Sequence, residues 1–177
     1  MSIQTVGIIG AGTMGNGIAQ ACAVSGVNVV MVDISEAAVA KGIATVSSSL
    51  DRLIKKEKMT EAEKTAALAR IHGSTQYQDL QKAQLVIEAA TENFDLKVKI
   101  LKQVDSLLAA DVIVASNTSS ISITKLAAAT TRADRFIGMH FFNPVPMMAL
   151  VEIIRGLQTS DATHDAVHAL AKRLGKS

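Results

Sequence analysis

The sequence is poor in the residues that mark secreted, membrane-bound and nucleic-acid-binding proteins. One cysteine in 177 residues excludes an internal disulfide framework and suits a reducing compartment. The net charge of +2 is too small to predict binding to nucleic acid or to a membrane surface. No apolar run approaches the roughly 20 residues that a membrane helix needs, and no signal peptide precedes the first apolar run. We therefore expect a cytoplasmic protein that binds neither nucleic acid nor membrane.

Aromatic residues are also few, with no tryptophan, one tyrosine and four phenylalanines. Alanine, valine, isoleucine and leucine must therefore build the core, as is typical of parallel strands covered by helices. Strand-like and helix-like runs alternate, which predicts an α/β fold with a Rossmann-like, doubly wound sheet. The length favours one domain, residues 1–177. We expect strands at 6–9, 27–32, 71–74, 85–89, 112–116, 136–139 and 150–154, and helices that include 14–25, 95–108 and 161–174.

A glycine-rich turn follows the first strand, in the order Gly10-Ala-Gly12-Thr-Met-Gly15. Gly10 allows a tight turn, Gly12 lets the backbone approach a pyrophosphate, and Gly15 lets the next helix pack close to the sheet. Thr13 and Met14 open that helix, whose free N–H groups and dipole favour phosphate. The pattern predicts dinucleotide binding; the alternative is a tight strand-to-helix turn without a ligand.

Asp33 closes the second apolar run, where a carboxylate can accept hydrogen bonds from an adenosine ribose. The residues that follow it, Ile34 and Ser35, are not basic. A 2′-phosphate would meet the carboxylate and no arginine, so the sequence favours NAD over NADP.

The interval between Asp33 and the third strand is about twice as long as a simple crossover needs. Apolar residues recur in it at helical spacing, and Thr60 with Glu63 can form a capping box for a second helix. We expect a helical hairpin inserted after the second strand, with lysines such as Lys56 at its tip. These lysines belong either to a solvated charged turn or to an arm that meets a polyanionic ligand.

Two polar clusters follow predicted strands, at the edge where doubly wound sheets bind ligands. The first contains Glu88 and Glu92, with Lys97 in the next helix. It is either part of a site or an ordinary helix-end charge with a surface lysine. The second, Ser116-Asn-Thr-Ser-Ser120, offers Asn117 and Ser119 to cofactor and substrate. Its alternative is a loop with a helix N-cap.

A third cluster, Gly138-Met-His140-Phe-Phe-Asn143-Pro-Val-Pro146, ends a strand at the same edge. If the two prolines reverse the chain, Glu152 returns beside His140. A carboxylate on one ring nitrogen fixes the tautomer and leaves the other nitrogen as a base. Oxidation of an alcohol by NAD needs such a base, while serine or asparagine can hold the oxygen. No metal site is predicted.

The motifs Ile8-Ile-Gly-Ala-Gly-Thr-Met-Gly15, Asn117-Thr-Ser-Ser120 and Gly138-Met-His-Phe-Phe-Asn-Pro-Val-Pro146 together resemble the 3-hydroxyacyl-CoA dehydrogenase family. Within it, the chain is similar to the bacterial 3-hydroxybutyryl-CoA dehydrogenases from Ser2 to Ser177. The resemblance implies NAD-dependent oxidation of an L-3-hydroxyacyl-CoA to the 3-oxoacyl-CoA, or the reverse reduction of acetoacetyl-CoA. The resemblance implies these site residues: His140 as the base, Glu152 as its orienting partner, Ser119 on the 3-oxygen, NAD contacts from Asp33, Glu92, Lys97, Ser119 and Asn143, and coenzyme A contacts from Ser49 and Lys56.

Members of this family continue beyond the equivalent of Ser177 as a helical domain that supplies an active-site asparagine and most dimer contacts. The resemblance therefore implies that this domain lies outside the chain. It also implies a homodimer for the full-length protein, and a monomer or weak dimer with poor turnover for residues 1–177. Two other functions stay open at this point. One is a related dehydrogenase of a small hydroxy or sugar acid, and the other is a nucleotide-binding module without turnover.

Overall fold

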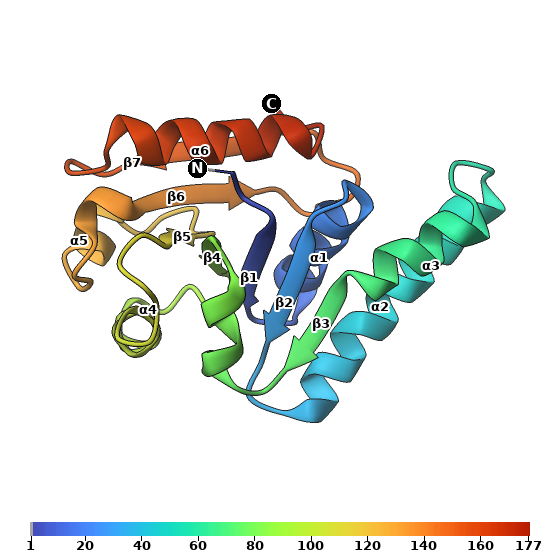
Figure 1. Cartoon of the computed structure of the whole chain (residues 1–177), viewed down its shortest axis with the longest axis horizontal. Coiled ribbons are helices and arrows are strands. Elements are labelled where there is room, and N and C mark those ends of the chain that lie inside the picture. The colour runs from blue at the N-terminus through green and yellow to red at the C-terminus, as the bar shows by residue number, and fades with distance from the viewer. Residues whose placement is uncertain (1) are drawn as a thin grey trace.

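A seven-stranded sheet in the order β3-β2-β1-β4-β5-β6-β7 forms the body of the protein, shown by a computed structural model that describes residues 2–177 (Figure 1). The first six strands are parallel, and β7 pairs antiparallel with β6. The strands are β1 (Thr5–Ile9), β2 (Asn28–Val32), β3 (Ile71–Ser74), β4 (Leu85–Glu88), β5 (Ile113–Ser116), β6 (Phe136–Phe141) and β7 (Val151–Arg155). The helices are α1 (Thr13–Val24), α2 (Glu36–Lys55), α3 (Glu61–Ala69), α4 (Phe94–Asp105), α5 (Ile123–Ala127) and α6 (Asp161–Arg173), with 3-10 turns at Tyr77–Lys82 and Ala133–Arg135.

Side chains of the central strands feed two cores, one on each face of the sheet. In β4, Leu85 and Ile87 join the core under α1 and α6, whereas Val86 joins the core under α4 and α5. This alternation follows from the period of two along a strand. Helices therefore cover both faces, and the predicted doubly wound α/β fold is confirmed (Figure 1). Within residues 2–177, no helix combines the length and apolarity needed to cross a bilayer.

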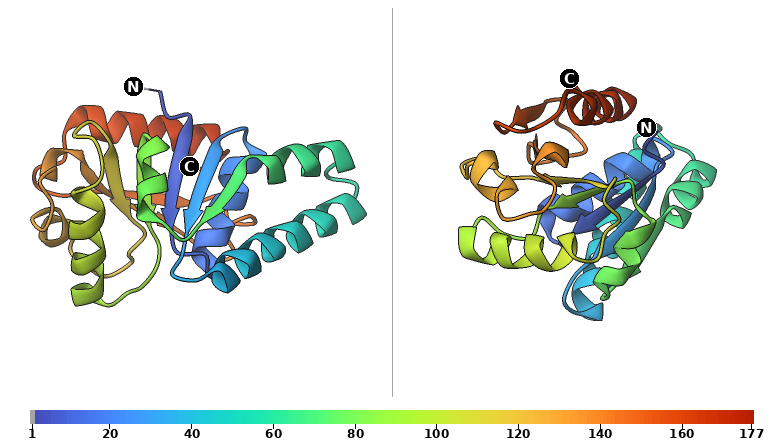
Figure 2. Two further views of the ribbon diagram at one scale, coloured as in Figure 1. Left: turned by 60° about the horizontal axis from the view of Figure 1, so that its bottom comes forward. Right: turned by 60° about the vertical axis from the view of Figure 1, so that its left-hand side comes forward.

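The predicted hairpin insertion is present as α2 and α3, which project past the β3 edge of the sheet (Figure 2). Val46 and Leu50 of α2 are buried in the core under α1, so the middle of α2 packs against the body of the protein. The capping box forms as expected, because Thr60 accepts from the Glu63 N–H and the Glu63 side chain accepts from the Thr60 N–H. The turn at the tip contains Lys56.

The last strand departs from an all-parallel sheet. The segment between β6 and β7 contains the two prolines and a cis Asn143–Pro144 peptide bond, and it reverses the chain. The antiparallel register places His140 directly opposite Glu152. Val145 of this segment packs on α1 at Gly17, where a Cβ would lie 2.8 Å from Val145. The ammonium of Lys176 donates to the carbonyls of Val145 and Met148, so the segment that follows α6 is joined to this turn.

A buried ion pair joins α4 to the segment before β6. Arg132 is 4% exposed, and its Nε donates to Asp105 Oδ1 over 2.6 Å. The same guanidinium donates to the carbonyls of Asp105, Leu108, Ala109 and Val112. Burial would raise the pKa of Asp105, but hydrogen bonds from Arg132 and Thr131 outweigh it and lower that pKa.

Candidate active site

The three glycines of the turn after β1 have different structural causes. Gly10 has a φ of 108°, a conformation that favours glycine. A Cβ at Gly15 would lie 1.7 Å from the carbonyl oxygen of Gly10, so this position admits no side chain. Gly12 has an ordinary φ of −72°, and a Cβ there would meet nothing within 4 Å. The space in front of Gly12, at the N-terminus of α1, therefore fits a ligand phosphate rather than protein atoms.

Asp33 accepts hydrogen bonds from the backbone at this turn. Its Oδ2 accepts from the Ala11 N–H over 2.8 Å, and its Oδ1 accepts from the Ile34 N–H over 2.6 Å. Beside it lies a cavity of about 390 Å³, here called the turn cavity, between the glycine-rich turn and the segment after β4. Seven of the residues predicted to bind NAD line the turn cavity: Gly10, Gly12, Thr13, Met14, Asp33, Glu92 and Asn117.

Lys97 is not a surface lysine. Its side chain has no exposed surface, and its Nζ lies 2.5 Å from Glu88 Oε1 and 3.7 Å from Glu92 Oε1. Glu88 is equally enclosed and also accepts from the Ser116 hydroxyl and the Ala90 N–H. Lys97 does not line the turn cavity, whereas Glu92 does, so the Lys97 ammonium contacts the carboxylate of a lining residue rather than the cavity itself.

Glu92 gathers the hydroxyl groups that follow β5. Its Oε2 lies 3.3 Å from the hydroxyl oxygens of Thr118, Ser119 and Ser120. Asn117 is tied to the next strand instead, since its Oδ1 accepts from the Phe141 N–H over 2.8 Å. The segments after β4, β5 and β6 thus form one connected polar surface at the carboxyl edge of the sheet.

His140 and Glu152 meet as the sequence predicts. The distance from His140 Nδ1 to Glu152 Oε1 is 3.1 Å, and the Phe142 ring lies 4.4 Å from the imidazole between ring centroids. The histidine side chain is 17% exposed, and no described residue forms a hydrogen bond with its Nε2. With Nδ1 facing the carboxylate, Nε2 is the nitrogen left to exchange a proton. The pair therefore has the geometry that a general base with an oriented ring would need.

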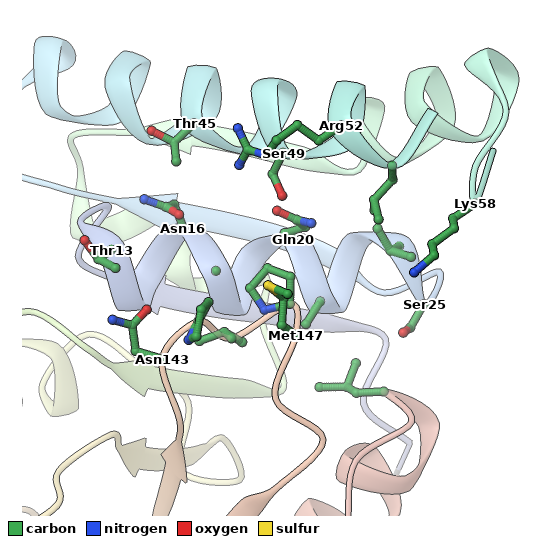
Figure 3. Close-up of a pocket in the computed structure, with 18 of the residues that line it drawn as sticks. Thr13, Asn16, Gln20, Ser25, Thr45, Ser49, Arg52, Lys58, Asn143 and Met147 are labelled. Atoms are coloured by element: carbon green, nitrogen blue, oxygen red, sulfur yellow. The ribbon is translucent and has the colours of Figure 1, made fainter. Parts of the chain in front are cut away.

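A groove of about 630 Å³ runs between α1 and α2, here called the α1–α2 groove (Figure 3). Lys58 and Ser25 lie at one end, and Thr13 and Asn143 lie at the other. Thr13 also lines the turn cavity, so the two spaces meet at the start of α1. Both residues predicted to bind coenzyme A, Ser49 and Lys56, line the groove, and Asn143, predicted to bind NAD, lines it together with Thr13.

Several residues of these sites were not predicted from the sequence. The sequence places Glu88 at the end of a strand without assigning it a role, although an acid that closes a buried strand is a usable signal. Arg52 and Lys58 join Lys56 on the groove, and helical spacing from Ser49 could have indicated Arg52. Gln20, in the apolar stretch of α1, gave no signal that it faces a cavity.

Comparisons with known proteins agree with this geometry. Residues 5–177 match the 3-hydroxyacyl-CoA dehydrogenase NAD-binding domain family. The 3-hydroxybutyryl-CoA dehydrogenase of Bradyrhizobium diazoefficiens is 50% identical over 174 residues, which cover 98% of this chain and 59% of that protein. The crystal structure of (S)-3-hydroxybutyryl-CoA dehydrogenase from Ralstonia eutropha is 78% identical with a TM-score of 0.98, covering 99% of this chain and 62% of that one. The crystal structure of 3-hydroxybutyryl-CoA dehydrogenase from Escherichia coli K12 is 37% identical with a TM-score of 0.97, covering 100% of this chain and 38% of that one.

The chain thus spans about three fifths of the length of the Bradyrhizobium and Ralstonia proteins. The match covers the glycine-rich turn, the turn cavity and the His140–Glu152 pair. The chain belongs to the 3-hydroxyacyl-CoA dehydrogenase family and comprises its NAD-binding domain.

Proposed function

We propose that the protein carrying this chain interconverts an L-3-hydroxyacyl-CoA, such as 3-hydroxybutyryl-CoA, and the matching 3-oxoacyl-CoA. The observation that carries this proposal is the meeting of two spaces at Thr13. One has the residues of a dinucleotide site, and the other is a long groove lined by three exposed cationic residues, Arg52, Lys56 and Lys58. A small hydroxy or sugar acid would leave most of this groove unused, which makes that alternative the weaker one.

The turn cavity is proposed to receive the adenosine and pyrophosphate of NAD, which when bound supplies the carbon that accepts or returns the hydride. Asp33 is suited to the adenosine ribose, and Gly12, Thr13 and Met14 to the pyrophosphate at the start of α1. Glu92 and Asn117 line the remainder of the cavity. Ser119, beside Glu92, and Asn143, at the end of the groove, are proposed to contact the nicotinamide half. Lys97 is proposed to support NAD binding by holding Glu92.

His140 is the proposed base. In the oxidation, Nε2 takes the proton of the 3-hydroxyl group. Nδ1 keeps its own proton and donates a hydrogen bond to Glu152, whose negative charge offsets the positive charge on the ring. In the reduction, the same nitrogen returns the proton. The Ser119 hydroxyl is proposed to hold the 3-oxygen, since it lies on the segment after β5 at the same edge of the sheet as His140.

Ser49 and Lys56 are proposed to contact coenzyme A, with the phosphates at the cationic end of the α1–α2 groove. Phosphate suits these side chains because they offer charge-assisted hydrogen bonds. Three broader assignments complete the proposal: a homodimer for the intact enzyme, a monomer or weak dimer for residues 1–177, and a cytoplasmic location with no nucleic-acid partner.

Turnover of acetoacetyl-CoA with NADH by the intact enzyme tests the chemistry. Replacing His140 with Ala should lower kcat by at least ~10²-fold, the usual size of lost general-base catalysis, with little change in NADH affinity. Glu152→Gln should cost less, because the imidazole remains. Near-normal kcat in His140→Ala would refute the mechanism.

Lys56→Ala tests the groove. It should raise KM for acetoacetyl-CoA with little effect on kcat, the pattern of lost uniform binding. The effect should disappear with acetoacetyl-pantetheine, which lacks the nucleotide. Lys99→Ala, on the exposed face of α4, is the control and should change neither constant. Equal effects of Lys56→Ala on both substrates would place the phosphates elsewhere.

A further inference from the structure

Gln20 is a buried polar residue whose side chain has no hydrogen-bond partner among residues 2–177. It lies on α1, is 4% exposed, and lines the α1–α2 groove. Among residues 2–177, no hydrogen bond to its side-chain amide is formed. Figure 3 shows the Gln20 amide pointing across the groove toward Ser49 of α2. This position combines burial with unused donors and acceptors.

The amide is open only to the groove. Within residues 2–177, no side-chain nitrogen or oxygen is both fully enclosed and unpartnered, so the polar end of Gln20 must touch the solvent of the groove. The neighbouring residues of α1, Ile18, Ala19 and Cys22, are fully buried. Gln20 lines the groove whereas these three residues do not, so its side chain lies on a different face of α1 from theirs. Packing against these residues therefore gives no reason for glutamine here.

The place of Gln20 along the groove indicates what it could bind. It lies between the cationic end at Lys56 and Lys58 and the end at Asn143 (Figure 3). An extended ligand with phosphates at the first end and its reacting group at the second would pass its middle over Gln20. A carboxamide carries both N–H donors and a carbonyl acceptor, so its natural partner is another amide, which offers one C=O and one N–H.

We propose that Gln20 is a specificity-determining residue that hydrogen-bonds a secondary amide in the arm joining the coenzyme A phosphates to the thioester, with Ser49 on the opposite wall. This inference rests on the proposed function, because only a pantetheine-type arm brings amides to this place. Free hydroxy acids have no such arm and gain nothing from Gln20. The residue thus favours carrier-bound substrates over free ones.

The test is binding to residues 1–177 in the presence of NADH, for the unmutated chain and for Gln20→Met, which keeps the shape and removes the amide. Three probes divide the ligand: coenzyme A, pantetheine, which has the amides but no nucleotide, and adenosine 3′,5′-bisphosphate, which has phosphates but no amide. Calorimetry suits coenzyme A, and NMR titration suits the weaker fragments. Gln20→Met should weaken coenzyme A and pantetheine by about 3- to 10-fold, as expected for one neutral hydrogen bond or slightly more. The bisphosphate should be unaffected.

Two controls keep the result interpretable. Gln103→Met makes the same exchange on the exposed face of α4 and should change nothing. NADH affinity, which depends on the turn cavity, should be unchanged in both variants and reports on folding. If Gln20→Met fails to fold, Gln20→Glu retains the shape, removes the N–H donors and should also weaken pantetheine.

The outcomes separate this inference from the proposed function. Unchanged affinity of Gln20→Met for coenzyme A and pantetheine would overturn the inference and leave the proposed function intact. An equal loss with the bisphosphate would also overturn it, since the residue would then only shape the groove. If the unmutated chain fails to bind coenzyme A at millimolar concentration, the proposal that coenzyme A binds in the α1–α2 groove is itself refuted.

Discussion

Replacing Gly12 with Ala should weaken NADH binding while leaving the protein folded. The backbone at Gly12, with φ −72° and ψ −165°, is open to alanine, and the added Cβ would meet no atom within 4 Å. Alanine is a poorer N-cap than glycine, but it also lowers the entropy of the unfolded chain. These opposing effects leave a net change in stability within about 1 kcal/mol. The new methyl group would instead occupy the space proposed for the pyrophosphate.

The loss of affinity can be estimated from the contacts that the methyl group prevents. One charge-assisted hydrogen bond from the start of α1 is worth about 1.5–3 kcal/mol, so NADH affinity should fall by roughly 10- to 150-fold. Gly15→Ala is the matched contrast, because its Cβ would lie 1.7 Å from the Gly10 carbonyl oxygen. That variant should lose more than about 4 kcal/mol of stability.

Calorimetric titration with NADH and thermal unfolding measure the two quantities separately. The reasoning fails if Gly12→Ala binds NADH like the unmutated chain, because the open space would then not hold the pyrophosphate. It also fails if Gly12→Ala and Gly15→Ala are equally destabilised, because both glycines would then serve the fold alone.

Three further predictions follow from single residues. NADH should bind the unmutated chain at least ~10-fold more tightly than NADPH, since Asp33 would face the 2′-phosphate without an arginine beside it. In the same titration, Asp33→Ala should reduce this ratio between the two affinities. Because the pKa of Asp105 is lower in the folded state, its stabilising contribution is present above the unfolded-state pKa and is lost as pH falls through the folded-state value. In denaturant unfolding, Asp105→Asn should lower the free energy of unfolding by about 3–5 kcal/mol at pH 7, because it leaves the buried Arg132 charge unpaired. The same variant should lose less stability than the unmutated chain when the pH falls below ~4. Burial raises the pKa of Cys22 to about 12, so a thiol-specific reagent at pH 8 should label it only in denaturant; rapid labelling of the native chain would contradict this.

Local signals in the sequence were sufficient for the glycine-rich turn, the strands and the capping box at Thr60. Each depends on residues that are neighbours in the chain, so spacing and side-chain chemistry determine them directly. The meeting of His140 with Glu152 was predicted only on the condition that the prolines reverse the chain. The condition holds, and it is also the reason that β7 breaks the parallel order.

Residues whose surroundings come from distant parts of the chain could not be read in this way. Lys97 follows the pattern of an exposed helix residue, but Glu88 and Ser116 form a buried acidic site that only the assembled sheet creates. Arg132 finds its partners at the end of α4 for the same reason. Gln20 lies on a helix face that would be ordinary core if α2 did not leave a groove beside it. Burial of polar groups was thus the part of the site that periodicity could not reveal.

The antiparallel pairing of β6 with β7 also makes the protein sensitive to changes in chain length between His140 and Glu152. These two residues are direct partners in the ladder, so the strand register sets the distance between base and carboxylate. A slip of one residue would turn Glu152 to the other face of the sheet, and a slip of two would place an aliphatic residue opposite the imidazole. A deletion or insertion of one residue in the proline turn should therefore be tolerated only if the turn absorbs it without moving the ladder. Libraries that vary this turn should recover active members with substitutions far more often than members of altered length.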